Sequence, residues 1–239
     1  MEKVIVFNVK SALGSFQRPQ SNNNPSTFLI IPKSAMVGMI CAVLGLDRDF
    51  MKESNMYKIL TEKLRYSVIS RSPFQIKCWS EYGYNHGNVF QSKKRLIYTP
   101  AKFERLIDVN YDIYVMYDDN DIDIKTLLLN FVENVKFNQF MFPPYMGMAN
   151  FPADLTFIGE YEPQACNGKF NTNAICTELV TDDSQPFKNI KHDDIPTLSI
   201  SYLAHDRDSY KTVYFHDSCG SLEAEGNYYL VGKEAIEFI

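Results

Sequence analysis

The most constraining feature of the sequence is a strand pattern that runs into an amphipathic helix pattern near the middle of the chain. In residues 109–117 one face carries an apolar or aromatic residue at every second position, which predicts a strand. Asp121 or Asp123 then stands where a helix N-cap is expected. The apolar residues that follow recur at three- and four-residue spacing: Ile124, Leu127, Leu128, Phe131, Val132 and Val135. This is the clearest amphipathic helix in the sequence.

The N-terminal segments predict a buried strand followed by a helix. Residues 4–10 alternate, with Val4 and Val6 on one face and Ile5, Phe7 and Val9 on the other. A polar loop occupies residues 14–27. Pro32 then precedes Ser34, a candidate N-cap, and the apolar run that follows ends at Gly45.

The remaining patterns predict the other helices and strands of the core and give the order of its elements. Residues 56–64 predict a second helical piece, and residues 64–79 are β-like with a bend at Pro73. A loop rich in proline and glycine leads to a strand at residues 155–161. The order is strand, helix, strand, strand, helix, strand, which is the ferredoxin-like order also used by RNA-recognition domains. The fold class is therefore predicted as α+β with a ferredoxin-like core.

The C-terminal third predicts an antiparallel β lobe. Short strand patterns separated by turns occur at residues 174–181, 197–203, 210–216 and 227–231. We therefore expect a core domain at residues 1–161 and a β lobe at residues 162–239.

Charge is distributed unevenly along the 239 residues. Residues 1–105 contain 16 lysines and arginines against 7 acidic residues, whereas the rest of the chain contains 8 against 22. The net charge of −5 hides this division, which fits one basic face for a polyanion and an acidic remainder. The alternative is that the charges form ordinary solvated faces.

Composition excludes several classes of protein. The five cysteines are widely spaced and include no CxxC pair, which argues against a disulfide framework and a zinc site. No apolar run approaches the roughly 20 residues of a membrane helix, and the N-terminus does not have the pattern of a signal peptide. We expect a cytoplasmic protein without a membrane partner, a metal or a cofactor.

The richest motif is the loop at residues 14–27 together with the start of the following helix. Arg18 and Lys33 can contact phosphates, Phe16 can offer a stacking surface, and Ser34 stands at a helix N-terminus whose dipole attracts anions. The alternative is an ordinary loop between a strand and a helix.

The same residues resemble the N-terminal signature of the CRISPR-associated Cas-five family, within the RAMP superfamily. The matching positions are Gly14, Phe16, Arg18, Pro19, Thr27, Pro32, Ala35, Gly38, Leu44 and Gly45. The later segments YTPAKFERLIDVNYDIYV and FPPYMGMANFPADL look like type I-B members of that family. The sequence departs from the family pattern at Phe28, where Tyr is common. The resemblance covers residues 1–161 well and the rest loosely.

The resemblance implies a fold, a role and partners. It implies a thumb hairpin at residues 77–102, in which Lys93, Lys94 and Arg95 supply positive charge, and a glycine-rich loop that contains Gly147. It also implies a subunit of the Cascade effector complex, in antiviral defence or RNA-guided DNA targeting, which binds the 5′ handle of the guide RNA (crRNA). Its neighbours would be the backbone subunit and the large subunit. This role is not catalytic.

Some members of the family cut precursor guide RNA without a metal, and this is the main alternative. They use a Tyr, His and Lys group to activate the ribose 2′-hydroxyl. Tyr82, Tyr84, His86 and Lys77 lie together in the predicted thumb and provide the same residue types. A further alternative is a protein-interaction module that uses only the acidic half of the chain.

Two apparent metal motifs are better explained in other ways. His192, His205 and His216 each precede an aspartate, but the region is predicted as β whereas phosphohydrolases with this dipeptide are helical. Asp119, Asp121 and Asp123 resemble the start of a calcium loop, but the glycine and glutamate that such a loop needs are absent from their positions. Helix capping explains these acids.

Overall fold

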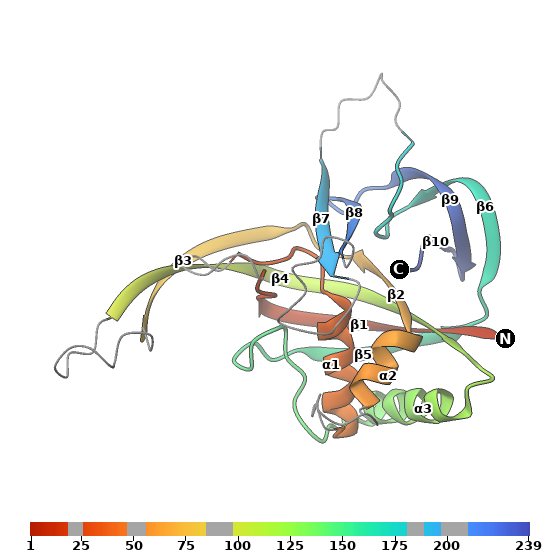
Figure 1. The fold of residues 1–239 in the computed structure, drawn as a ribbon, viewed down its shortest axis with the longest axis horizontal. Coiled ribbons are helices and arrows are strands. Elements are labelled where there is room, and N and C mark those ends of the chain that lie inside the picture. The colour runs from red at the N-terminus through yellow and green to blue at the C-terminus, as the bar shows by residue number, and fades with distance from the viewer. Residues whose placement is uncertain (19–25, 47–55, 85–97, 181–188, 197–209) are drawn as a thin grey trace.

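A computed structural model describes residues 1–18, 26–46, 56–84, 98–180, 189–196 and 210–239 (Figure 1). Its centre is an antiparallel sheet formed by β1 (Glu2–Gly14), β2 (Arg65–Ser70), β4 (Tyr98–Asp118) and β5 (Asp154–Tyr161). The strand order is β2-β4-β1-β5. With the helices included, this is the topology of a ferredoxin-like fold, as the sequence predicts.

Helices cover one face of this sheet, and the C-terminal strands cover part of the other (Figure 1). The helices are α1 (Lys33–Leu44), α2 (Met56–Lys63) and α3 (Ile122–Phe137). Phe7 on β1 faces them and meets Phe131 of α3 edge to face, with ring centroids 5.2 Å apart. Val4 and Val6 face the opposite way and pack with residues of the C-terminal lobe, including Val231 and Ile236. The predicted alternation of β1 is therefore confirmed.

The helix ends follow the predicted signals with one exception. The Asp121 side chain accepts a hydrogen bond from the backbone N–H of Ile124 at 3.2 Å and so caps α3. Gly45 adopts a left-handed conformation at φ 71° and ends α1. The expected N-cap at Ser34 is wrong, because α1 begins at Lys33, two residues earlier than that cap implies. Pro32 takes the N-cap position without a side-chain hydrogen bond.

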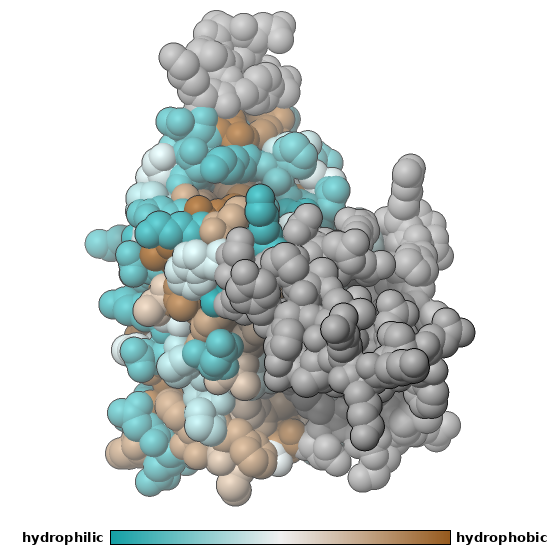
Figure 2. Space-filling model, turned by 90° about the vertical axis from the view of Figure 1, so that its left-hand side faces the viewer, coloured by the Kyte–Doolittle hydropathy of each residue, from teal (hydrophilic) through white to brown (hydrophobic). Residues whose placement is uncertain are grey.

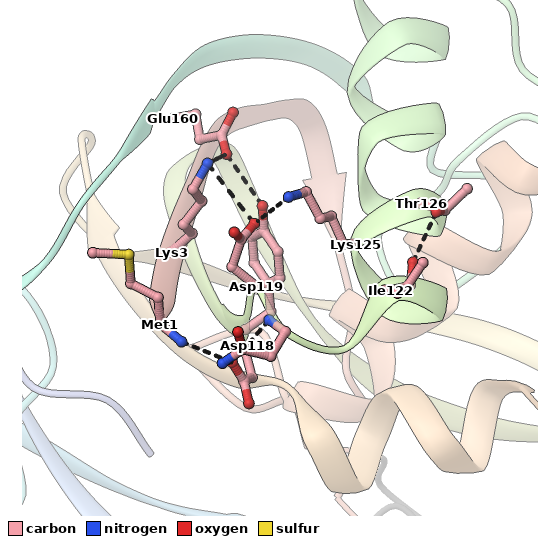
Figure 3. A network of polar contacts seen from close by, with 10 residues as sticks. Met1, Lys3, Asp118, Asp119, Ile122, Lys125, Thr126 and Glu160 are labelled. Carbon is pink, nitrogen blue, oxygen red and sulfur yellow. Dashed lines mark hydrogen bonds and ion pairs between the residues drawn. The ribbon is translucent and has the colours of Figure 1, made fainter.

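Charged residues join the start of β1, the end of β4 and the start of α3 (Figure 3). The ammonium of Lys125 lies 2.9 Å from an oxygen of Asp119, and Lys3 lies 3.8 Å from the same oxygen and 3.3 Å from Glu160. The hydrogen bond from Lys125 holds the pKa of the Asp119 carboxyl below its usual range. Two lysines therefore neutralise Asp119, while Asp121 caps the helix.

A long hairpin projects from the core (Figure 1). β3 (Gln75–Tyr84) pairs with the first half of β4, in a register that runs from Gln75 opposite Ile107 to Tyr84 opposite Tyr98. The hairpin lies where the thumb is predicted, at residues 77–102. Its second strand continues into the central sheet and pairs there with β2. Lys93, Lys94 and Arg95 fall outside the described residues.

The C-terminal strands form two small sheets. One has the order β10-β9-β6, and the other pairs β7 with β8. Their bounds are β6 (Gln164–Thr172), β7 (Ile190–Pro196), β8 (Tyr210–His216), β9 (Leu222–Val231) and β10 (Glu234–Ile236). The predicted strand at residues 210–216 is confirmed, and residues 227–231 lie within β9.

One strand prediction in this lobe is wrong. In the predicted strand at residues 174–181, the described residues 174–180 form only isolated bridges, such as Cys176 with Tyr214 and Leu179 with Ala224, which join them to strands of both small sheets. Residues 197–203 lie outside the described residues. β6 is not predicted because only Phe170 and Thr172 of its nine residues are buried, which leaves little apolar alternation. The proposed division after residue 161 falls between β5 and β6.

Gly147 brings the loop between α3 and β5 against the end of β1. The backbone N–H of Ser15 donates to the carbonyl of Met146 at 3.0 Å. Gly147 has a φ of 81°, and a Cβ added to it would lie 1.8 Å from the carbonyl oxygen of Ser15. Only glycine fits here without a shift of the backbone.

We expect Gly147→Ala to lower the free energy of unfolding by about 4 kcal/mol, because backbone strain and a backbone collision act together. Chemical denaturation measures this. Gly168→Ala is the matched control, since Gly168 also has a positive φ but an added Cβ would meet nothing within 4 Å. The control should cost about 1–3 kcal/mol. Equal losses in the two variants would contradict the close approach at Gly147.

Candidate nucleic-acid interface

The two ends of the loop after β1 pair with each other. Gln17 and Thr27 form an antiparallel bridge, and the N–H of Phe28 donates to the carbonyl of Phe16 at 2.9 Å. The Thr27 hydroxyl accepts from the N–H of Phe16 at 2.8 Å. Residues 19–25, which join these ends, lie outside the described residues. The described part of the loop is thus a short ladder with fixed backbone positions.

Arg18 is held by a carboxylate from the C-terminal lobe. Its Nη2 lies 2.6 Å from Oδ1 of Asp193 on β7, and its Nε donates to the carbonyl of Thr27 at 3.2 Å. The guanidinium carbon also lies 4.8 Å from the centre of the Phe28 ring. The Arg18 side chain keeps 30% exposure, whereas the Asp193 side chain has none. An RNA phosphate can therefore reach only the exposed part of Arg18.

Asp193 is an unusual group because its carboxylate is buried. Its Oδ2 accepts a hydrogen bond from the backbone N–H of Leu29 at 2.8 Å. The Asp193 side chain on β7 therefore binds both Arg18 and the backbone of Leu29. Burial raises the pKa of Asp193, and the hydrogen bond from Leu29 and the charge of Arg18 offset this only in part.

Phe16 and Gly147 meet behind this loop. Phe16 is 4% exposed, and one of its ring carbons would lie 3.1 Å from a Cβ at Gly147. The predicted stacking surface of Phe16 is therefore turned into the core, and its contact with RNA stays a prediction. The structure brings Phe16 and Gly147 together, and Arg18 lies two residues farther along the chain, where it contacts Asp193.

Lys33 and Ser34 lie at the start of α1, where the sequence places an anion site. Lys33 is 9% exposed, and burial, assisted by the charges of Arg65 and Lys211, lowers the pKa of its amine. The carbonyl of Ser34 accepts a hydrogen bond from the Tyr57 hydroxyl at 3.0 Å. Most of the Lys33 side chain is covered, so a phosphate could reach only a small part of it.

An aromatic cluster that was not predicted from the sequence lies at the base of the hairpin. Arg105 is 6% exposed, and its guanidinium carbon lies 5.0 Å from the ring centre of Trp79, 5.1 Å from Phe151 and 5.9 Å from Phe103. Trp79 and Phe103 are partly exposed. One feature of the sequence could have indicated this cluster. The single tryptophan of the chain, Trp79, lies in a segment that also contains the cation Lys77.

The surface seen from the hairpin side mixes hydrophilic and hydrophobic patches (Figure 2). Brown patches are frequent in the lower half of this view, at the end of the molecule where Figure 1 places the helices. Three large apolar side chains at and just after the end of α3 are exposed: Phe137, Met141 and Phe142, at 66%, 69% and 58%.

Comparisons with known proteins agree with this fold. A family model described as CRISPR-associated protein (Cas_Cas5) matches residues 4–104. A CRISPR protein from Archaeoglobus fulgidus has a crystal structure that aligns with a TM-score of 0.57 at 13% identity, covering 98% of each chain. A chain of a CRISPR RNA-guided surveillance complex aligns with a TM-score of 0.53 at 12% identity, covering 98% of this chain and 93% of the other. No curated protein matches the chain.

The chain is similar to Cas5 CRISPR-associated proteins over the matched segment, which spans β1, the following loop, α1 and the hairpin base. The predicted resemblance and the ferredoxin-like fold class are therefore confirmed. Among the described residues, no helix is long and apolar enough to cross a membrane. In the same residues, no group of three potential metal ligands gathers.

The buried carboxylate predicts a specific pH dependence. Because the pKa of Asp193 is raised in the folded chain, the folded state holds this proton more tightly than the unfolded state. The contribution of Asp193 to the free energy of unfolding is therefore largest below the pKa of an unfolded aspartate, about 4. It decreases as the pH rises through the pKa of Asp193 in the folded chain.

The measurement is the free energy of unfolding of the wild type minus that of Asp193→Asn across this range, since asparagine does not titrate. The difference should decrease with rising pH and then level off. A difference that increases with pH would show that the ion pair with Arg18 outweighs burial.

Proposed function

We propose that this chain is a non-catalytic subunit of a type I CRISPR Cascade complex, similar to type I-B members, and that it binds the 5′ handle of the guide RNA. The observation that carries the proposal is the match of residues 4–104 to the Cas5 family model. That segment contains the loop ladder, the start of α1 and both strands of the hairpin base.

The charge distribution supports RNA as the ligand. The matched segment belongs to the basic part of the sequence, residues 1–105, and the segment between β3 and β4 carries Lys93, Lys94 and Arg95. A hairpin that projects from a sheet, with three cations in the sequence that joins its strands, suits contact with a single-stranded RNA end. Arg18 and Lys33 lie nearer the core and would contribute through their exposed atoms.

The proposed protein partners are the backbone subunit and the large subunit of the complex. The structural relative in an RNA-guided surveillance complex supports membership of a multisubunit assembly. The exposed Phe137, Met141 and Phe142 add a second support, because large apolar side chains gathered on a surface are typical of protein contacts. Antiviral defence in the cytoplasm is part of this proposal.

The central test is whether the chain binds guide RNA through the hairpin. RNA that co-purifies with the protein and its complex should have one fixed 5′ end when sequenced. Replacing Lys93, Lys94 and Arg95 with alanine removes three cations, so the slope of log affinity against log salt should become shallower by roughly 2.

The matched control replaces three lysines of the C-terminal lobe, Lys169, Lys191 and Lys233, which removes the same charge elsewhere. Its salt slope should stay close to that of the wild type. If both triple variants change the slope equally, the hairpin is not the RNA contact and attraction is general.

We also expect no cleavage of precursor guide RNA by the purified chain, with or without a divalent metal. Lys77 and Tyr82 lie on β3, and His86 lies outside the described residues. Incubation with end-labelled precursor RNA decides the question. Specific cleavage that disappears in His86→Ala would replace this proposal with the metal-independent endoribonuclease.

A further inference from the structure

Trp79 and Phe103 form a cross-strand aromatic pair at the base of the hairpin. They stand directly opposite each other in the β3–β4 register, so their side chains emerge on the same face of the hairpin. Both are partly exposed, although tryptophan and phenylalanine gain most from burial. The pair therefore offers aromatic surface to solvent at a fixed position next to the central sheet.

Arg105 lies beside this pair on the same face of the hairpin and holds it in place. It is two residues from Phe103 on β4, is 6% exposed, and contacts Trp79 and Phe103 together with Phe151 of the loop that contains Gly147. Cation–π contacts of this kind orient an aromatic ring. Because Arg105 is almost fully buried against the indole, a ligand would meet the exposed part of Trp79 in an orientation that is already set.

A cation stands beside the aromatic pair. Lys77 is two residues before Trp79 on β3, and alternation along a strand puts both side chains on the same face. Its side chain is exposed, and it stands opposite Arg105 in the register. Sites for single-stranded nucleic acid combine these two elements, an aromatic surface for a base and a cation for the neighbouring phosphate.

We propose that Trp79, flanked by Phe103 and backed by Arg105, is a stacking platform for one base of the bound single-stranded RNA, and that Lys77 contacts the adjacent phosphate. This inference rests on the proposed RNA-binding function and assigns it a position. The stacking contact with a base is therefore assigned to Trp79 at the base of the hairpin, and not to Phe16, which is buried. Recognition by stacking tolerates any base, because every base has a π face.

The single tryptophan makes the test direct, since all indole emission of the protein comes from Trp79. The purified chain is titrated with a short single-stranded RNA, and binding is followed in parallel by filter retention and by tryptophan emission. We expect the emission to be quenched with the same dissociation constant that filter retention gives. The same RNA with abasic sites throughout should bind more weakly and leave the emission unchanged.

Variants give an independent readout by filter retention. Trp79→Leu should weaken binding roughly 5- to 100-fold, and Trp79→Phe should restore most of the affinity because it keeps a ring. Tyr228→Leu is the matched control, since Tyr228 stacks on Phe170 in the C-terminal lobe with ring centroids 4.4 Å apart. It should bind like the wild type. Circular dichroism checks that each variant is folded.

The outcomes separate this inference from the proposed function. RNA binding with unchanged wild-type emission, and with Trp79→Leu as tight as the wild type, would overturn the platform and leave the RNA-binding function intact. Failure of the wild-type chain to retain any RNA would overturn both. The emission measurement uses the unaltered protein, so it stays decisive even if Trp79→Leu does not fold.

Discussion

The pairing of β4 is the constraint on which the rest of the structure depends. Its C-terminal half lies between β1 and β2 in the central sheet, and its N-terminal half pairs with β3 in the projecting hairpin. Ile113 and Val115 are fully buried, so a slip of one residue would turn them to the wrong face. The core therefore fixes the register of the hairpin as well, and with it the position of Trp79 opposite Phe103. The positions of Trp79, Phe103 and Lys77 on the hairpin are therefore set by packing in the central sheet.

The core fold could be predicted because its signals are local. The alternation of Val4 to Val9, the apolar stripe of α3 and the cap at Asp121 each lie within a few residues of sequence, and the structure contains them. The N-cap at Ser34 failed because Pro32 already fixes the backbone where the helix begins. The C-terminal lobe was harder because its edge strands bury few side chains. A polar strand such as β6 forms through pairing with β9, which no local pattern reveals.

The contacts of the candidate site were also hard to predict, because they join residues that are far apart in the sequence. The sequence points to Arg18, and the resemblance adds Gly147, yet neither identifies the partners that fix them. Asp193 is 175 residues from Arg18, and Ser15 meets Gly147 only when two loops approach in the folded chain. In the sequence Arg105 is one of 16 basic residues in residues 1–105, and the structure buries it among three aromatic rings. Long-range contacts decide whether a charged or aromatic side chain is available to a ligand, and a single sequence does not contain them.

The distance between Arg18 and Asp193 along the chain has a consequence for synthesis. The loop after β1 leaves the ribosome early, whereas the carboxylate that holds it is made much later, when β7 emerges. Until then Arg18 and the Leu29 amide have no contact with Asp193. The final arrangement of this loop can therefore form only after most of the chain has been translated. A nascent chain that stops before β7 would display Arg18 without the carboxylate that pairs with it.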